Sequence, residues 1–134
     1  MMRKFQLLIG SALSLLFLAG CGPTFTDLPL PGGRVSGDTI ELQMRFDEAL
    51  SLAQGAMVKV NGIEAGRVES VTVKDYRALV KARVQRSAKI RVDASARLRY
   101  TTPLGELFVD VTNPDAGQVI SDHGMIDPER STTA

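Results

Sequence analysis

Few side chains in this sequence have a type and spacing that could do chemistry. The one histidine, His123, stands between Asp122 and Gly124, which is typical of a solvated turn, and no metal-ligand spacing surrounds it. The adjacent carboxylates Asp47 and Glu48 point apart on an irregular segment, whereas acid–base catalysis needs a defined geometry. The sequence contains no nucleophile motif and no phosphate-binding loop. We therefore expect a protein that is not an enzyme, without catalytic residues, metal site or cofactor.

The only cysteine, Cys21, is a candidate for covalent modification. The segment Leu18-Ala19-Gly20 before it resembles the bacterial lipobox, in which the cysteine is lipidated and becomes the first residue of the mature chain. A basic start, Met1–Lys4, and an apolar run, Phe5–Leu18, are typical of a secretory signal. The alternative is an ordinary thiol in a tail. We expect a signal peptide over residues 1–20 and a lipid anchor on Cys21, which places the protein at the cell membrane on its extracytoplasmic face.

The charge of the mature chain argues against one class of partner. The sequence has 16 Lys and Arg against 15 Asp and Glu, and losing Arg3 and Lys4 with the leader leaves 14 against 15. Nucleic-acid binding is favoured by a clear basic excess, so we expect no nucleic-acid partner.

Charge is distributed unevenly along the chain. Nine basic residues and two acids lie between Lys74 and Arg99, whereas six acids and no base lie between Glu106 and Glu129. Both segments could be solvated outer surfaces, which is common. They could also meet head to tail between neighbouring subunits, with Arg97 and Arg99 as contributors.

The elements that position these residues are short strands, organised around the segment Met57–Val73. Asn61-Gly62 lies between alternating apolar and polar residues and predicts a two-residue type I′ hairpin turn, in which both central residues need positive φ. Gly66 follows where a bulge bends the sheet or where another backbone approaches closely. The segment predicts a hairpin with a bent second strand.

Alternating hydrophobicity predicts the other strands. They lie within Asp38–Phe46, Ala78–Val84, Ala96–Tyr100, Leu107–Val111 and Gln118–Ile126. Asp47–Gly55 has a short helical spacing and predicts a connection with a turn or two of helix. Six or seven short strands without a long helix favour a small all-β barrel or sandwich. We place it at residues 38–128, after a Pro/Gly-rich tether at 21–37 and before a C-terminal tail at 129–134, in which Ser131–Ala134 are expected to be frayed.

A loop interrupts the strand pattern at Thr101–Glu106. Pro103 cannot donate a ladder hydrogen bond, so we expect the loop to protrude, with Leu104 on it. The alternative is a leucine that folds back onto the barrel.

Several segments together resemble the Mce/MlaD (mammalian cell entry) domain family in order and spacing. They are Phe46–Ala49, Leu52, Gly55-Ala56, Val58–Val68 and Thr102–Val109, and the resemblance covers about Thr39 to Asp127. The lipobox followed by Leu28–Gly32 is similar to the lipoprotein member of actinobacterial Mce operons. Those lipoproteins usually continue into a helical region beyond the point where this sequence stops, so a fragment and a short form both stay open.

The resemblance implies a seven-stranded barrel that assembles as a hexameric ring around a hydrophobic pore, from one chain or from sibling Mce subunits. Such rings are extracytoplasmic parts of ABC-type lipid transporters, so the implied partners are a permease, an ATPase and a lipid or sterol substrate. By position, Pro103 and Leu104 correspond to the pore-lining loop, with proline replacing the first leucine of a Leu-Leu pair. The alternative function is a structural or assembly lipoprotein that docks on such a complex without lining the lipid path.

Overall fold

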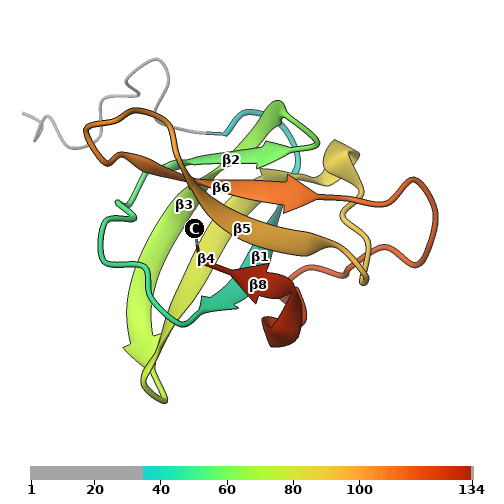
Figure 1. The fold of residues 1–134 in the computed structure, drawn as a ribbon. Helices are drawn as coiled ribbons and strands as arrows, with labels where there is room; N and C mark the ends of the chain where they lie inside the picture. Colours follow the sequence, from blue (N-terminus) through green and yellow to red (C-terminus); the bar gives the residue numbers. More distant parts are fainter. Residues whose placement is uncertain (1–34, 134) are drawn as a thin grey trace, which may run out of the picture.

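The fold is one strongly curled β-sheet (Figure 1). The computed structural model describes residues 35–133. Its eight strands are β1 (Thr39–Phe46), β2 (Met57–Val60), β3 (Ile63–Lys74), β4 (Arg77–Gln85), β5 (Ser95–Tyr100), β6 (Leu107–Thr112), β7 (Gly124–Met125) and β8 (Ser131–Thr132). They lie in the order β7-β1-β4-β3-β2-β6-β5-β8. The all-β class predicted from the sequence is confirmed, with eight strands where the family resemblance implied seven.

Strand pairing combines hairpins with three parallel contacts. The β1–β4, β3–β4, β2–β3 and β5–β6 pairs are antiparallel, and the β2–β6, β1–β7 and β5–β8 pairs are parallel. Two short 3₁₀ helices, η3 (Arg86–Ala88) and η4 (Pro128–Arg130), lie in the connections. No helix among residues 35–133 is long and apolar enough to cross a bilayer.

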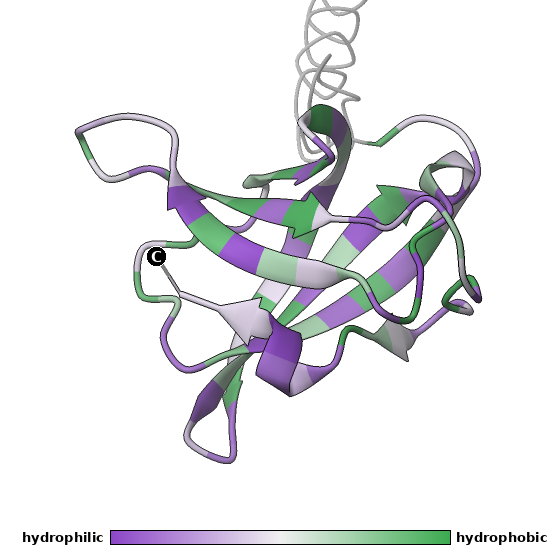
Figure 2. Cartoon of the chain, turned by 45° about the vertical axis from the view of Figure 1, so that its right-hand side comes forward, coloured by the Kyte–Doolittle hydropathy of each residue, from purple (hydrophilic) through white to green (hydrophobic). Residues whose placement is uncertain are grey.

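The core fills the concave side of the sheet. Along β1 and β4 every second residue is buried, as the alternating sequence predicts, and Figure 2 shows the matching change of hydropathy along the strands. The largest fully buried side chains are Phe46, Leu42, Met44, Ile90, Leu98 and Ile126. Since each apolar side chain contributes about 1.5–3 kcal/mol when buried, this inner surface supplies the main stabilisation.

Two register shifts bend the long strand β3. One residue is inserted opposite β2, where Val58 pairs with Gly66 and Lys59 with Glu64, and another lies opposite β4 between Val68 and Ser70. A Cβ on Gly66 would clash with the carbonyl oxygen of Arg83 on β4. Bulges increase local twist, so β3 carries much of the sheet's curl.

The two ends of the sheet meet without a hydrogen-bonded ladder between β7 and β8. The chain between them crosses the seam: Ile126 is fully buried and η4 lies against β1. The residues we expected to form a frayed tail extend the fold, because Ser131–Thr132 pair with β5 and Ser131 is buried. The Thr133 hydroxyl donates to the Glu48 carbonyl at 3.1 Å, which ties this segment to the opposite end of the sheet.

The connection from Asp47 to Gly55 contains turns and no helix, so the predicted helical turns are wrong. Single bonds from Leu52 N to Ala49 O and from Ala56 N to Ala53 O, each 3.1 Å, close two tight turns. Ala49 and Leu52 are both buried. Their three-residue spacing therefore reflects two anchors of one turn.

Candidate functional site

The loop between β5 and β6 protrudes from one end of the sheet (Figures 1 and 2). Thr101 N donates to Glu106 O at 2.7 Å and closes the base, and Gly105 N donates to Thr102 O at 3.2 Å within it. Gly105 has a φ of 95°, which glycine adopts without strain. Pro103 and Leu104 form the tip, and 94% of Leu104 is exposed. The leucine does not fold back onto the sheet.

A hollow of about 340 Å³ lies beside the base of this loop. Thr101 and Glu106–Phe108 line one side, and the connection Ser51–Met57 lines the other. Tyr100, at the end of β5, is 61% exposed, and half-buried Leu107 pairs with it across β5 and β6. Apolar groups therefore continue from the core to the loop through the end of the sheet.

The charged residues near the hollow are few. Arg67 forms an ion pair with Glu64 and donates to the Gly55 carbonyl at 3.4 Å, so it fastens the connection to β3. Glu106 is exposed and makes no ion pair with another residue of the described range 35–133. The tip of the loop itself is uncharged. An apolar ligand would meet little desolvation cost there.

The predicted turn residues lie at the other end of β2 and β6. Asn61 and Gly62 have φ values of 50° and 84°, as a type I′ turn requires. The Asn61 side chain exchanges bonds of 2.9 and 2.8 Å with the backbone of Asn113. The Asn113 side chain in turn bonds the backbone of Arg91 at 2.8 Å and of Ala88 and Lys89 at 3.2 Å each. Sequence reasoning missed Asn113, because its partners come from distant segments.

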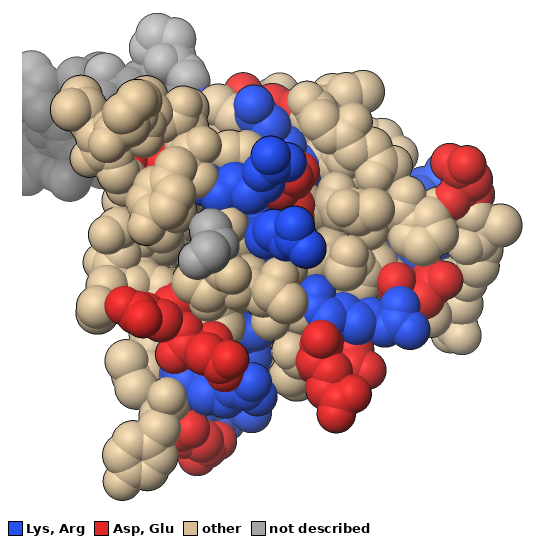
Figure 3. Space-filling model, viewed as in Figure 1, with Lys and Arg blue, Asp and Glu red and all other residues tan. Residues whose placement is uncertain are grey.

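The basic segment predicted from the sequence is largely neutralised within the chain. Five of its nine cations form internal ion pairs: Arg77–Asp47, Lys81–Glu41, Arg83–Glu69, Arg86–Asp38 and Arg99–Asp110. A local concentration of cations remains over β5 and β6 (Figure 3), where Lys59 and Arg97 flank Asp110 in register. Lys59 Nζ lies 4.9 Å from the centre of the Phe108 ring, a cation–π contact.

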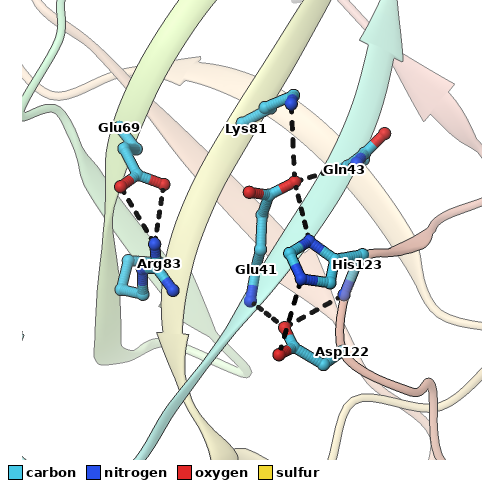
Figure 4. A network of polar contacts seen from close by, with 7 residues as sticks. All are labelled: Glu41, Gln43, Glu69, Lys81, Arg83, Asp122 and His123. Atoms are coloured by element: carbon cyan, nitrogen blue, oxygen red, sulfur yellow. Dashed lines mark hydrogen bonds and ion pairs between the residues drawn. The ribbon is translucent and has the colours of Figure 1, made fainter.

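His123 belongs to a polar cluster on the outer surface of β1 and β4 (Figure 4). Its Nδ1 lies 3.3 Å from Glu41 Oε1 and its Nε2 lies 3.8 Å from Asp122 Oδ2. Asp122 accepts a 2.8 Å bond from Glu41 N, and His123 N donates to Glu41 O at 3.0 Å. The cluster therefore holds the segment before β7 against β1. His123 thus has a structural role in addition to its place in the solvated turn that the sequence predicted.

The carboxylates of this cluster are held in their ionised form. The hydrogen bond from Gln43, together with His123 and Lys81, keeps the pKa of Glu41 below its ordinary value. The backbone N–H of Glu41 does the same for the pKa of Asp122. Groups with lowered pKa values stabilise the fold at neutral pH and lose that contribution as the pH falls through their folded-state values.

The lipidation and metal-binding predictions concern residues away from the loop. Cys21, with the signal peptide and most of the tether, lies outside the described residues 35–133. Within that range, no group of three or more His, Cys, Asp or Glu is arranged to hold a metal ion. The loop with Leu104 and the hollow at its base thus form the candidate site.

Comparison with known proteins gives one family and one fold. Residues 38–114, more than half of the 134-residue chain, match the family described as MlaD protein. No curated protein matches the chain. Among solved structures, a chain of the Acinetobacter MlaFEDB complex in its ATP-bound Vtrans1 conformation is similar, with a TM-score of 0.63 and 16% identity over 99% of this chain and 91% of that chain. At that identity the likeness concerns the fold.

Proposed function

Because the chain belongs to the MlaD family, we propose that it is a non-enzymatic subunit of an Mce/MlaD-type lipid transport system. The similar solved chain belongs to the MlaFEDB complex, which was solved with ATP bound. By analogy, the partners of this subunit are an ABC permease, an ATPase that supplies energy, and further MlaD-type chains, either copies of itself or siblings. In the mature protein, the lipidated Cys21 anchors the subunit at the extracytoplasmic face of the cell membrane.

One observation carries the proposed role of the loop: Leu104 is 94% exposed at the tip of a protruding, uncharged loop. An exposed leucine forfeits about 1.5–3 kcal/mol of burial free energy, which contact with an acyl chain would recover. When several chains form a ring, their 101–106 loops converge on the ring's centre. Pro103 and Leu104 of each copy then supply an apolar path for lipid or sterol, and the stiff Pro103 limits how the loop can fold back.

A leucine substitution with a matched control tests this role. We expect Leu104→Asp to reduce lipid transfer by the assembled transporter at least about tenfold, because a carboxylate in an apolar path must be desolvated. Leu50→Asp is the control, because Leu50 is 89% exposed on the connection between β1 and β2. Both substitutions should leave the melting temperature unchanged, because both side chains are exposed. Normal transfer by Leu104→Asp in an intact complex would contradict the pore role.

The anchor is tested separately. We expect Cys21→Ala to abolish the acyl modification detected by mass spectrometry and to release the protein from the membrane fraction, since cysteine supplies the only acceptor of this kind in the chain. A second measurement distinguishes a conduit from an accessory lipoprotein. Co-purification of lipid with an assembly of the chain and its siblings supports the conduit. The conduit is contradicted if that assembly contains no lipid and if the transporter transfers lipid equally well when this chain is absent.

A further inference from the structure

The second half of β3 has a free edge. β2 pairs with β3 only from Ile63 to Arg67, and the last bonds on that side join Val68 to Gly55 and Ala56, each 2.8 Å. Beyond the bulge, Ser70–Lys74 pair with β4 alone. No backbone hydrogen bond from elsewhere in residues 35–133 reaches this segment. Within the described residues, the backbone groups of this five-residue stretch that face away from β4 are therefore unpaired.

This edge is unlike the two ends of the sheet. β7 and β8 contain two residues each, which is too short to template another strand. The free part of β3 contains neither proline nor glycine, and its centre, Val71-Thr72-Val73, consists of good strand formers. Val73 is 81% exposed. Natural sheets usually protect an edge of this kind, so an exposed one indicates a place for an added strand.

The hairpin that carries the edge projects beyond the rest of the molecule (Figures 1 and 2). Its two turn residues, Asp75 and Tyr76, have φ values of 53° and 60°, and Tyr76 is completely exposed. Each such conformation costs an ordinary residue about 1 kcal/mol or more. Because the hairpin projects and its turn is exposed, another chain can reach the free edge of β3.

The pairing with β4 decides which backbone groups face outward. Lys74 and Arg77 flank the two-residue turn and form its hydrogen-bonded pair. Hydrogen-bonded and non-bonded pairs alternate along an antiparallel ladder. Val73 and Val71 therefore turn their N–H and C=O groups away from β4, and Thr72 does not.

We propose that this edge binds the same edge of a second copy of the chain, as an antiparallel strand pair with its two-fold axis at Thr72. Val71 of each copy then hydrogen-bonds with Val73 of the other, and the two Thr72 residues form the non-bonded pair between them. The exposed Val73 side chain gains Val71 of the second copy as its cross-strand neighbour, a pairing that stabilises sheets.

Charge favours a second copy in this orientation. An acid, Glu69, comes immediately before the segment Ser70–Lys74, and a base, Lys74, ends it. Lys74 makes no ion pair with any of the residues 35–133, and the Glu69 side chain is 45% exposed beside Arg83. Antiparallel pairing brings the Glu69 end of each copy next to Lys74 of the other. It also brings Glu69 opposite Asp75, whose carboxylate lies 3.8 Å from Arg45 of its own chain. Parallel pairing would instead place Glu69 beside Glu69 and Lys74 beside Lys74.

The contact is small. A ladder of a few residues buries much less than the roughly 1,200 Å² of stable complexes, so the pair forms reversibly and a covalent trap is the appropriate probe. The inference is independent of lipid transport, because it uses only the edge and its residues.

Cysteine cross-linking of the full chain in detergent tests the register. In the proposed pair the two Thr72 Cα atoms lie about 4.5 Å apart, within disulfide range. Thr72→Cys should therefore give, on mild oxidation, at least about ten times more covalent dimer than the wild type, which retains Cys21. Ser70→Cys is the matched control, because the two Ser70 residues lie roughly four positions apart along the ladder.

Further variants decide the outcome. The double variant Ser70→Cys/Lys74→Cys should cross-link, and adding Val73→Pro to Thr72→Cys should abolish the dimer by removing an outward N–H. Equal dimer yields from Thr72→Cys and Ser70→Cys would overturn the register. Absence of any Thr72→Cys dimer in a folded protein, or its linkage to a different protein, would overturn the choice of a second copy.

Discussion

The two ends of β3 carry the same kind of turn and use it in opposite ways. At its start, Asn61-Gly62 forms a type I′ turn whose asparagine is bonded to Asn113 and so to the connection after β4. At its end, Asp75 and Tyr76 also both have positive φ, and the tyrosine is completely exposed. Two turns with positive φ at both central residues thus hold the sheet to the rest of the fold at one end and extend it into solvent at the other. The surrounding side chains determine which role a turn has.

The largest effect should come from the first bend of β3, at Gly66 opposite β2. Gly66→Ala places a Cβ against the Arg83 carbonyl and 3.0 Å from the Val84 Cα, both backbone atoms that cannot move aside without disturbing β4. We expect the free energy of unfolding to fall by about 3 kcal/mol or more, measured by urea denaturation. Ser70→Ala, in the same strand, is the control and should change it by less than about 0.5 kcal/mol. An equally mild effect of Gly66→Ala would show that the bend tolerates a side chain.

A second, smaller effect should come from Asn113, which bonds the Asn61-Gly62 turn to the connection after β4. Asn113→Ala removes the acceptor for Arg91 N and the donors to Ala88 and Lys89. Because these groups are partly buried, we expect a loss of about 2 kcal/mol and faster hydrogen exchange in the Asn61-Gly62 turn. Asp115→Ala, two residues away on an exposed position, should cost less than about 0.5 kcal/mol. Unchanged exchange in Asn113→Ala would mean that the turn holds itself.

The smallest effect, with the opposite sign, should come from the projecting turn. Replacing Asp75-Tyr76 by Asn-Gly supplies the residues that type I′ turns prefer and removes the strain of a tyrosine at a φ of 60°. We expect a gain of about 1 kcal/mol, visible as a higher melting temperature. A loss of stability would indicate that Tyr76 or Asp75 contributes to the folded state, for example through the 3.8 Å Arg45–Asp75 pair.

Sequence predicted the first turn and missed the second for a physical reason. Asn-Gly is the dipeptide that both positive φ values select, so the hairpin follows from local chemistry. Asp-Tyr has no such preference, and the turn forms because the flanking strands pair from Gly66–Lys74 on β3 to Arg77–Val84 on β4. The same distinction applies to β8, whose two residues carry no periodic signal and depend on pairing with β5.

The candidate site divides in the same way. The protruding loop follows from Pro103, which interrupts a ladder, and Leu104 lies on it as the sequence predicts. The hollow at its base could not be predicted, because one of its sides is the Ser51–Met57 connection, whose path depends on the backbone bonds of Gly55 and Ala56 to Val68 on β3. Likewise, charge counted along the chain suggested two opposite patches, but ion pairs within the chain involve five of the nine cations of the basic one.

The seam between β7 and β8 has a consequence for the order of folding. β5 obtains its outer partner only when Ser131–Thr132 arrive, and these residues follow every other strand in the chain. During synthesis the curled sheet therefore stays open until Thr132 has been added, with its apolar inner surface incomplete. An intermediate that lacks β8 exposes part of its apolar inner surface, and surfaces of this kind make folding intermediates prone to aggregate.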